Sequence, residues 1–231
     1  MGFNTFQWKF INKCFTKSGL LKQNNKLPKY GIILNNEVFY GKQMLELGCQ
    51  EIRTVVRNRL QSKGTAKSYF KSIGIKHVSM DIKGCHRSKK FDLREPIPYQ
   101  YYNKFDIITN SGTTEHIIPL EGQYQTFKNI HLCAKVGSVM IHILPGIGDY
   151  YGHCQVYYKN KFFKVLAELN DYEIVLLEPI KNRKTFVWIG ICMIKKSDNE
   201  FTTDKTNFFK HIQWIKKSLY KKHKKNKNKY M

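Results

Sequence analysis

The sequence predicts an α/β fold built around a mostly parallel β-sheet. Strand-like apolar runs alternate with helical patterns through the middle of the 231-residue chain, which is typical of α/β domains. Hydrophobic residues make up 42% of the chain and aromatic residues 14%, which is enough to fill one core. Near the C-terminal end, two strand-like runs are separated by too few residues for a crossover helix, so they should pair as an antiparallel hairpin.

Glycines mark the ends of predicted elements in the first half of the predicted domain. The run Gln43–Leu47 reads as a strand that ends at Gly48, and Gly64 separates two helical patterns. The run Phe105–Thr109 is largely apolar and predicts a buried strand. In order, these elements are a strand at 43–47, helices at 51–60 and 65–73, strands at 77–82 and 105–109, and a helix at about 113–134.

The second half continues the alternation. Pro145 stops a strand at 138–144, and Leu166 lies on the apolar face of a helix at 161–169. The closing hairpin comprises strands at 172–177 and 186–194. One strand running against the others at this end of the sheet is a topological clue to the fold.

Both ends of the chain lie outside this central pattern. Apolar stripes predict one amphipathic helix at each end, comprising Phe3, Phe6, Phe10 and Cys14 in the first and Phe208, Ile212, Ile215 and Leu219 in the second. We expect both helices to dock on the domain, with a membrane or nucleic acid as the alternative partner. The predicted organisation is therefore an N-terminal helical extension (1–40), a central domain (41–196), and a basic C-terminal helix and tail (197–231).

A strong positive charge is the main compositional feature. Forty Lys and Arg residues against 17 Asp and Glu residues give a formal net charge of +23, and eight of the lysines lie between Lys216 and Lys229. Such a charge attracts polyanions. Only six of the basic residues are Arg, the residue favoured for forked phosphate and base contacts. Binding of RNA or another polyanion through the Lys-rich surface and tail is therefore a hypothesis.

The cysteines and the apolar runs indicate the compartment. The six cysteines form no CxxC pair, which favours reduced thiols over a disulfide framework or a zinc knuckle. Histidine and cysteine are adjacent at Cys85–His86 and at His153–Cys154 rather than at ligand spacing, so no metal is predicted. No apolar run reaches the roughly 18 residues of a membrane span. We expect a cytoplasmic protein without a membrane span.

The residues that follow the first two predicted strands are suited to a ligand. In open parallel sheets, ligands bind beyond the carboxyl ends of the strands. Gly48 allows a ligand to approach the backbone closely, and Asp81 can accept hydrogen bonds from a ribose diol or, alternatively, only cap its own loop. The GxGxxG and GxxxxGK[ST] phosphate motifs are absent. Glu46 would repel a phosphate but suits a cation, which favours an adenosine cofactor that carries a sulfonium.

Five segments, in order, resemble the class I S-adenosylmethionine-dependent methyltransferases from about Gly41 to Ile194. They are LELGCQ (45–50), in which Gln50 replaces the family's second glycine, HVSMDI (77–82), FDLREPIP (91–98), KFDIITNSGTTEHI (104–117) and VGSVMIHILP (136–145). The resemblance implies a three-layer Rossmann-like sandwich with a seven-stranded sheet and S-adenosyl-L-methionine as cofactor. The cofactor contacts that it implies are Glu46, Leu47, Gly48, Gln50, Asp81, Ile82, Asp92, Leu93, Asn110 and Ser111.

Histidines near the central strands are the candidate catalytic residues. Displacement at a sulfonium methyl mainly needs alignment of nucleophile, methyl and sulfur, but a hydroxyl acceptor also needs a base. His116, His142 and His153 follow or end central strands. We expect His116 to face the acceptor and Glu115 to cap its helix, because adjacent helical residues point about 100° apart. The alternative is that His116 is only packed.

The acceptor is constrained by missing motifs. The sequence after the strand at 105–109 lacks the [DNS]PP[YF] clamp for a flipped base, and no Cys follows a Pro anywhere. A small molecule, lipid or sugar is therefore the first hypothesis for the acceptor. The alternatives are an RNA methyltransferase that uses the basic surface, and a catalytically inactive basic nucleic-acid-binding module on the same fold.

Overall fold

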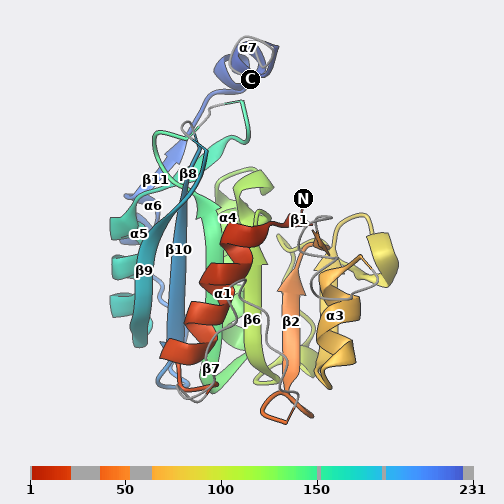
Figure 1. Cartoon of the computed structure of the whole chain (residues 1–231). Helices are drawn as coiled ribbons and strands as arrows, with labels where there is room; N and C mark the ends of the chain where they lie inside the picture. Colours follow the sequence, from red (N-terminus) through yellow and green to blue (C-terminus); the bar gives the residue numbers. More distant parts are fainter. Residues whose placement is uncertain (1, 22–36, 53–63, 150–151, 184–185, 226–231) are drawn as a thin grey trace.

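A seven-stranded sheet forms the centre of the protein in a computed structural model that describes residues 2–21, 37–52, 64–149, 152–183 and 186–225 (Figure 1). The strand order is β5-β4-β2-β6-β7-β10-β9. From β5 to β7 neighbouring strands are parallel, whereas β10 is antiparallel to both β7 and β9. The strands are β2 (Gln43–Leu47), β4 (Lys76–Asp81), β5 (Lys89–Lys90), β6 (Phe105–Ser111), β7 (Ala134–Pro145), β9 (Tyr172–Arg183) and β10 (Phe186–Lys195).

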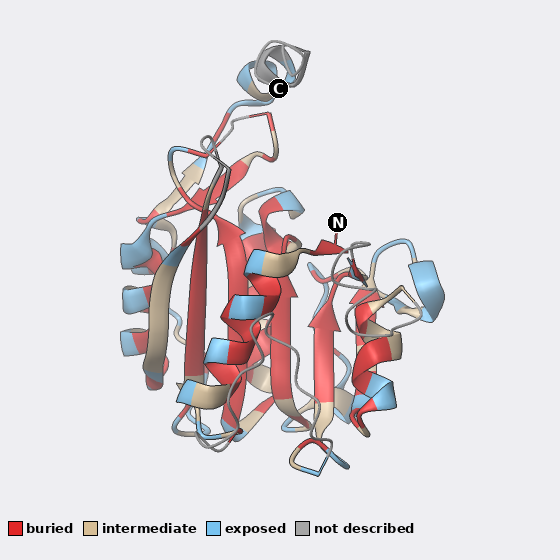
Figure 2. Ribbon diagram, viewed as in Figure 1, coloured by how far each residue is buried: buried red, intermediate tan, exposed pale blue. Residues whose placement is uncertain are grey.

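Helices cover both faces of the sheet and make three layers. On one face lie α1 (Thr5–Lys17) and α3 (Ala66–Ser72), and on the other lie α4 (Glu121–Cys133), α5 (Asn160–Leu169) and α6 (Lys205–Phe209). Successive residues of a strand point to opposite faces of the sheet. Ile107 therefore packs in the hydrophobic core under α1 and α3, and Ile108 packs in the core under α4, α5 and α6. The central strands are buried along most of their length (Figure 2).

The predicted fold class is confirmed, including the seven strands and the antiparallel strand next to the sheet edge. Strand β9 is longer than predicted, because its pairing with β10 continues past Leu177 as far as Arg183, and β10 extends by one residue to Lys195. The domain boundaries at residues 40 and 196 remain a prediction.

The N-terminal helix packs on the sheet through a face that includes only part of the predicted apolar stripe. Asn4 caps α1 with a reciprocal hydrogen-bond pair to Gln7. Phe10 and Cys14 are buried as predicted, but Phe6 is 47% exposed and Phe3 precedes the helix in β1 (Gly2–Phe3). The prediction was wrong at Phe6 because the cap at Asn4 starts the helix after Phe3 and fixes which side chains face the sheet.

The predicted C-terminal helix is replaced by three short elements. After α6, residues Ile212–Trp214 form β11, which pairs antiparallel with β8 (Val156–Tyr158). Ile215 packs with Cys154 and Tyr157 rather than along a helical stripe. The basic α7 (Lys217–Lys225) follows and projects away from the sheet (Figure 1). Pairing with β8 therefore overrides the helical periodicity of the sequence.

Two further predicted helices differ from the structure. The predicted helix at 113–134 begins only at Glu121, because Pro119 lacks an N–H and restricts Ile118 before it. A short 3₁₀ turn, η3 (Thr114–His116), precedes it. At the start of the predicted helix at 51–60, Glu51 and Ile52 form β3, which pairs with β1, and 53–60 lie outside the described residues.

Two other 3₁₀ turns, η1 (Cys85–Arg87) and η2 (Tyr99–Tyr101), complete the assignment. Among the described residues, none of the helices has the length and apolar character needed to cross a membrane.

Candidate functional site

The turn after β2 is held in a conformation that needs glycine. Gly48 has φ +80°, and its N–H donates to the Met80 carbonyl of the neighbouring strand at 2.7 Å. A Cβ at this position would lie 2.5 Å from Thr113 Oγ1. The Thr113 hydroxyl itself donates to the Leu47 carbonyl at 2.8 Å. The ends of β2, β4 and β6 are therefore tied together around a residue without a side chain.

The buried side chain of Glu46 stabilises this turn by a hydrogen bond to its backbone. Its side chain is buried, and Oε1 accepts the Gln50 backbone N–H at 2.9 Å. The other oxygen, Oε2, lies 3.5 Å from His77 Nε2, which is also buried. Glu46 is not among the residues that line the cavity described below, and its contact with a cofactor stays a prediction.

Gln50, which replaces a glycine of the family motif, links two strand ends. Its Nε2 donates to the Ser111 carbonyl at 2.7 Å, and the residue is only 4% exposed. Ser111 Oγ in turn accepts from Nε2 of Gln7 on α1 at 3.2 Å. The N-terminal helix is thus connected to the end of β6, which sequence reasoning did not detect because Gln7 lies 104 residues before Ser111.

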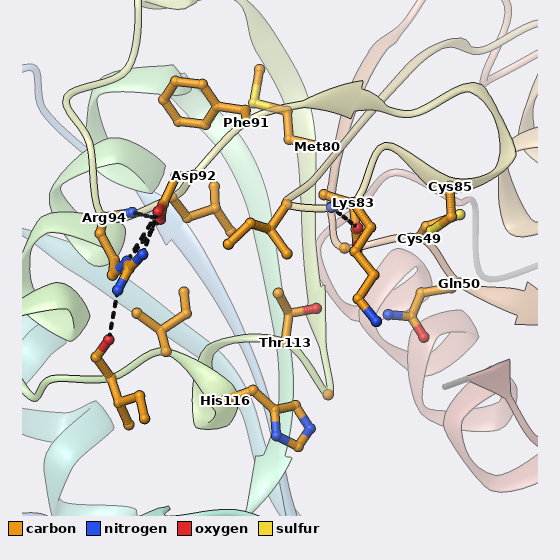
Figure 3. A pocket seen from close by; sticks show the side chains of 17 residues that line it. Cys49, Gln50, Met80, Lys83, Cys85, Phe91, Asp92, Arg94, Thr113 and His116 are labelled. Carbon is orange, nitrogen blue, oxygen red and sulfur yellow. Dashed lines mark hydrogen bonds and ion pairs between the residues drawn. The ribbon is translucent and has the colours of Figure 1, made fainter.

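A cavity of about 580 Å³ opens beyond the carboxyl ends of β2, β4 and β6 (Figure 3). The strand order reverses between β2 and β6, and this switch point is where open α/β sheets bind ligands. The lining residues come from the end of β4, from the loops after β2, β4, β5 and β6, and from η3 and the segment after it. They are Gly48, Cys49, Gln50, Met80, Asp81, Ile82, Lys83, Cys85, Phe91, Asp92, Leu93, Arg94, Gly112, Thr113, His116, Ile117 and Ile118.

Asp81 ends β4 at the cavity wall. Its Oδ1 accepts the Lys83 backbone N–H at 2.7 Å, so the carboxylate does cap its own loop. A carboxylate has about four lone-pair positions, which leaves acceptor capacity for a ligand. The loop-cap reading and the ligand reading are therefore compatible at Asp81.

Asp92 forms a forked ion pair with Arg94 on another wall of the cavity. Arg94 Nε lies 3.0 Å from Asp92 Oδ1, and Nη2 lies 2.6 Å from Oδ2. These hydrogen bonds lower the pKa of Asp92 below its ordinary value. Arg94 Nη1 also donates to the Ile118 carbonyl, which joins the 92–94 loop to the segment after η3. A ligand would have to share the Asp92 carboxylate with Arg94.

Two thiols lie together at the third wall. Cys49 and Cys85 both line the cavity and approach each other in Figure 3. Burial, followed by the hydrogen bond and charge of Cys85, raises the pKa of Cys49 to about 12. Cys49 therefore stays a neutral thiol at physiological pH and contributes an apolar, polarizable surface.

Asn110 and Ser111 lie beneath the cavity and not in its wall. Asn110 Nδ2 lies 3.1 Å from both Thr114 Oγ1 and His142 Nδ1. His142 is 1% exposed and stacks on Phe127, and burial lowers its pKa to about 3. The expectation that His142 is a catalytic base is contradicted by this position, since it lies in the core under α4 and does not reach the cavity.

Glu115 and His116 converge, contrary to the expectation that they diverge along a helix. Glu115 is fully buried, and its Oε1 lies 3.8 Å from His116 Nε2 and 3.5 Å from His153 Nε2. The His116 side chain is 44% exposed and faces the cavity, whereas His153 does not line it. Glu115 does not cap a helix, because residues 114–116 form only the turn η3.

Most, but not all, of the predicted contacts lie around the cavity. Those that line it are Gly48, Gln50, Asp81, Ile82, Asp92, Leu93 and His116. Those that do not line it are Glu46, Leu47, Asn110, Ser111, His142 and His153. Sequence reasoning missed Arg94 and Thr113, although the first lies two residues from a predicted contact and the second follows a predicted strand end.

The three-layer arrangement, with one antiparallel strand next to the edge of a seven-stranded sheet, is the Rossmann-like architecture that the sequence resemblance implied. No protein-family model matches the sequence, and no curated sequence matches it. Solved structures do match the fold. A putative S-adenosylmethionine-dependent methyltransferase from Listeria monocytogenes is 9% identical, with 82% of this chain and 99% of that chain covered and a TM-score of 0.49.

An N-methyltransferase, NodS from Bradyrhizobium japonicum WM9 in complex with S-adenosyl-L-homocysteine, is 12% identical with a TM-score of 0.48. The match covers 68% of this chain and 79% of NodS. A 1,6-didemethyltoxoflavin-N1-methyltransferase from Burkholderia thailandensis is also 12% identical, with 68% and 72% of the chains covered and a TM-score of 0.47. At these identities the likeness concerns the fold alone.

Proposed function

We propose that this protein is an S-adenosyl-L-methionine-dependent methyltransferase. The observation that carries the proposal is the cavity at the switch point between β2 and β6, walled by Gly48, Asp81 and Asp92 from three successive strand ends. Its volume of about 580 Å³ lies within the range of small-molecule sites. The family resemblance of the same three segments supports this reading.

Each wall of the cavity suits a different part of the cofactor. The close backbone approach at Gly48 suits the amino-acid part, and the Asp81 carboxylate suits the two ribose hydroxyls. Asp92 and Leu93 suit the adenine ring, although both Asp92 oxygens also accept hydrogen bonds from Arg94. The bound cofactor supplies an activated methyl group on a sulfonium, and the protein aligns it with the acceptor.

For the acceptor, we propose a small molecule, lipid or sugar that enters beside His116. This side chain is partly exposed at the end of the cavity that η3 forms, and an imidazole there can accept a proton from a hydroxyl acceptor. RNA remains the second candidate, supported by the exposed Lys83, Lys89 and Lys90 along the β4–β5 edge of the cavity. A catalytically inactive nucleic-acid-binding module is the non-enzymatic alternative.

Calorimetry with S-adenosylhomocysteine tests the cofactor directly. We expect a saturable heat of binding with one site per chain. Binding of RNA with no heat from S-adenosylhomocysteine would contradict the proposal and favour the inactive module. A screen for transfer of a tritiated methyl group to metabolite pools, lipid extract and RNA then identifies the acceptor class.

A further inference from the structure

A carboxylate and two imidazoles meet where η3 approaches the segment before β8. The ligand atoms of Glu115, His116 and His153 all lie within 4.8 Å of one another. The two histidines are 37 residues apart in sequence, and their rings lie 5.3 Å apart, centre to centre. The fold therefore creates a cluster of three metal-ligating groups that no local spacing motif encodes.

The carboxylate of this cluster is buried and incompletely satisfied. Glu115 has no exposed surface, and its Oε2 has no hydrogen-bond partner among the described residues. Its Oε1 lies 3.5 Å and 3.8 Å from the two imidazole Nε2 atoms, whereas charge-assisted N–H···O hydrogen bonds measure about 2.7–2.9 Å. Burying a carboxylate with an orphaned oxygen is costly unless a cation or a hydrogen-bond donor compensates it.

Both separations between the Glu115 carboxylate and the imidazoles agree with a shared metal ion, although the contact with His153 also falls at the outer limit of a hydrogen bond. Protein ligands lie about 2.0–2.2 Å from a zinc ion, so two ligand atoms of a tetrahedral site are separated by roughly 3.4 Å. The separations of 3.5 Å and 3.8 Å between Glu115 Oε1 and the Nε2 atoms of His116 and His153 are close to this value. A cation between the three groups would also neutralise the buried charge.

The surrounding contacts hold the ligands in place. Thr114, next to Glu115, accepts hydrogen bonds at Oγ1 from Asn110 and from the Tyr158 hydroxyl, and its carbonyl accepts from Gln123. The His153 ring packs near Trp188, with 5.7 Å between ring centres. A cluster on a fixed turn is preorganised, which is what an ion-binding site requires.

We propose that Glu115, His116 and His153 bind a divalent transition-metal ion at the η3 end of the cavity. Two imidazoles and one carboxylate suit Zn²⁺, Mn²⁺, Fe²⁺ or Co²⁺ rather than Mg²⁺ or Ca²⁺, which prefer oxygen ligands. Three protein ligands leave at least one coordination position, and His116 lines the cavity. If the proposed methyltransferase function holds, on which this last step rests, an oxygen atom of the methyl acceptor takes that position. With the ion bound, His116 acts as a ligand, and the ion in place of the imidazole promotes loss of the acceptor proton.

Cobalt binding to untagged, chelator-treated protein tests the site without any activity assay. We expect one Co²⁺ per chain, measured by visible absorption and by calorimetry. Glu115→Gln, His153→Gln and His116→Asn should each weaken Co²⁺ by at least about 100-fold, since even the loss of an outer-shell partner costs 10–100-fold. His116→Asn keeps the test valid if a buried variant does not fold, because His116 is partly exposed.

His86→Asn is the matched control. His86 forms a surface pair with Glu51 at 3.2 Å, and no third metal-ligating group joins this pair within the part of the chain that the structure describes. Asn also tolerates the positive φ of this position. This variant should bind Co²⁺ like the wild type. Absence of stoichiometric Co²⁺ from the wild type, or unchanged affinity in His116→Asn and His153→Gln, would overturn the metal site.

Calorimetry with S-adenosylhomocysteine on the same metal-free sample separates the two proposals. Co²⁺ binding without S-adenosylhomocysteine binding supports the metal site and contradicts the methyltransferase. S-adenosylhomocysteine binding without Co²⁺ binding gives the reverse result.

Discussion

Gly48 offers the sharpest test of how the cavity is built. Alanine at this position keeps φ +80°, which costs an L-residue about 1–2 kcal/mol. Its Cβ also meets Thr113 Oγ1 at 2.5 Å, so the hydroxyl must move away from the Leu47 carbonyl. Losing that hydrogen bond adds about 1 kcal/mol.

The two effects together give a loss of stability of about 2–3 kcal/mol. For a chain of this size, this corresponds to a fall in Tm of roughly 4–12 °C. The turn must also shift relative to Asp81 and Asp92, so affinity for S-adenosylhomocysteine should fall as well. Thermal unfolding and calorimetry on the same protein measure the two effects separately.

Gly137→Ala is a matched control for Gly48→Ala. Gly137 has φ +82°, but a Cβ there meets nothing within 4 Å. Its substitution should cost only the backbone strain and should leave S-adenosylhomocysteine affinity unchanged. Adding Thr113→Ala to Gly48→Ala should recover part of the stability by removing the clash. If Gly48→Ala is no more destabilising than Gly137→Ala and binds S-adenosylhomocysteine normally, the proposed role of this turn is wrong.

Three further outcomes are expected. Asp81→Ala should weaken S-adenosylhomocysteine by about 1.5–3 kcal/mol in calorimetry, and unchanged affinity in a folded variant would remove Asp81 from the site. Deletion from Lys216 onward should reduce the salt dependence of RNA affinity by several units of slope without changing cofactor affinity, whereas a preserved slope would place polyanion binding on the domain itself. Burial lowers the pKa of His131 to about 4 and of His142 to about 3, so the unfolded chain binds protons first and stability should fall as the pH drops below about 6.5. Urea unfolding at pH 7 and pH 4.5 should show this loss of stability, and the loss should be smaller in His142→Gln. An equal loss in that variant would contradict the lowered pKa of His142 in the folded protein.

The sheet could be predicted from the sequence because its signals are local. Strand β2 is a short apolar run closed by Gly48, and β6 is an apolar run that any sheet must bury. The short link between β9 and β10 was enough to predict an antiparallel pair. The C-terminal stripe failed because Ile212 pairs with Tyr158 across the fold, and periodicity carries no information on such long-range pairing.

The candidate site also contains residues that local sequence signals predict and residues that only tertiary packing brings together. Gly48, Asp81 and Asp92 lie at strand ends, so their place at the cavity follows from topology once the strands are assigned. Gln7 and His153 reach the site from distant parts of the chain, and only packing brings them there. His142 was a candidate because it lies on a central strand, but the alternation of side chains along β7 directs it into the core under α4.

The position of Glu115 in the sheet follows from the sequence, whereas its surroundings depend on tertiary packing. Its position after the fourth parallel strand was predictable, but its role depends on the turn η3 and on a histidine from the segment before β8. As part of a long helix, Glu115 and His116 would point about 100° apart and could not share a ligand. Pro119 disfavours one continuous helix from residue 113, and the short turn η3 lets both side chains meet His153. A single proline thus converts a predicted helix cap into a buried carboxylate beside two imidazoles, next to the end of the cavity where a methyl acceptor would enter.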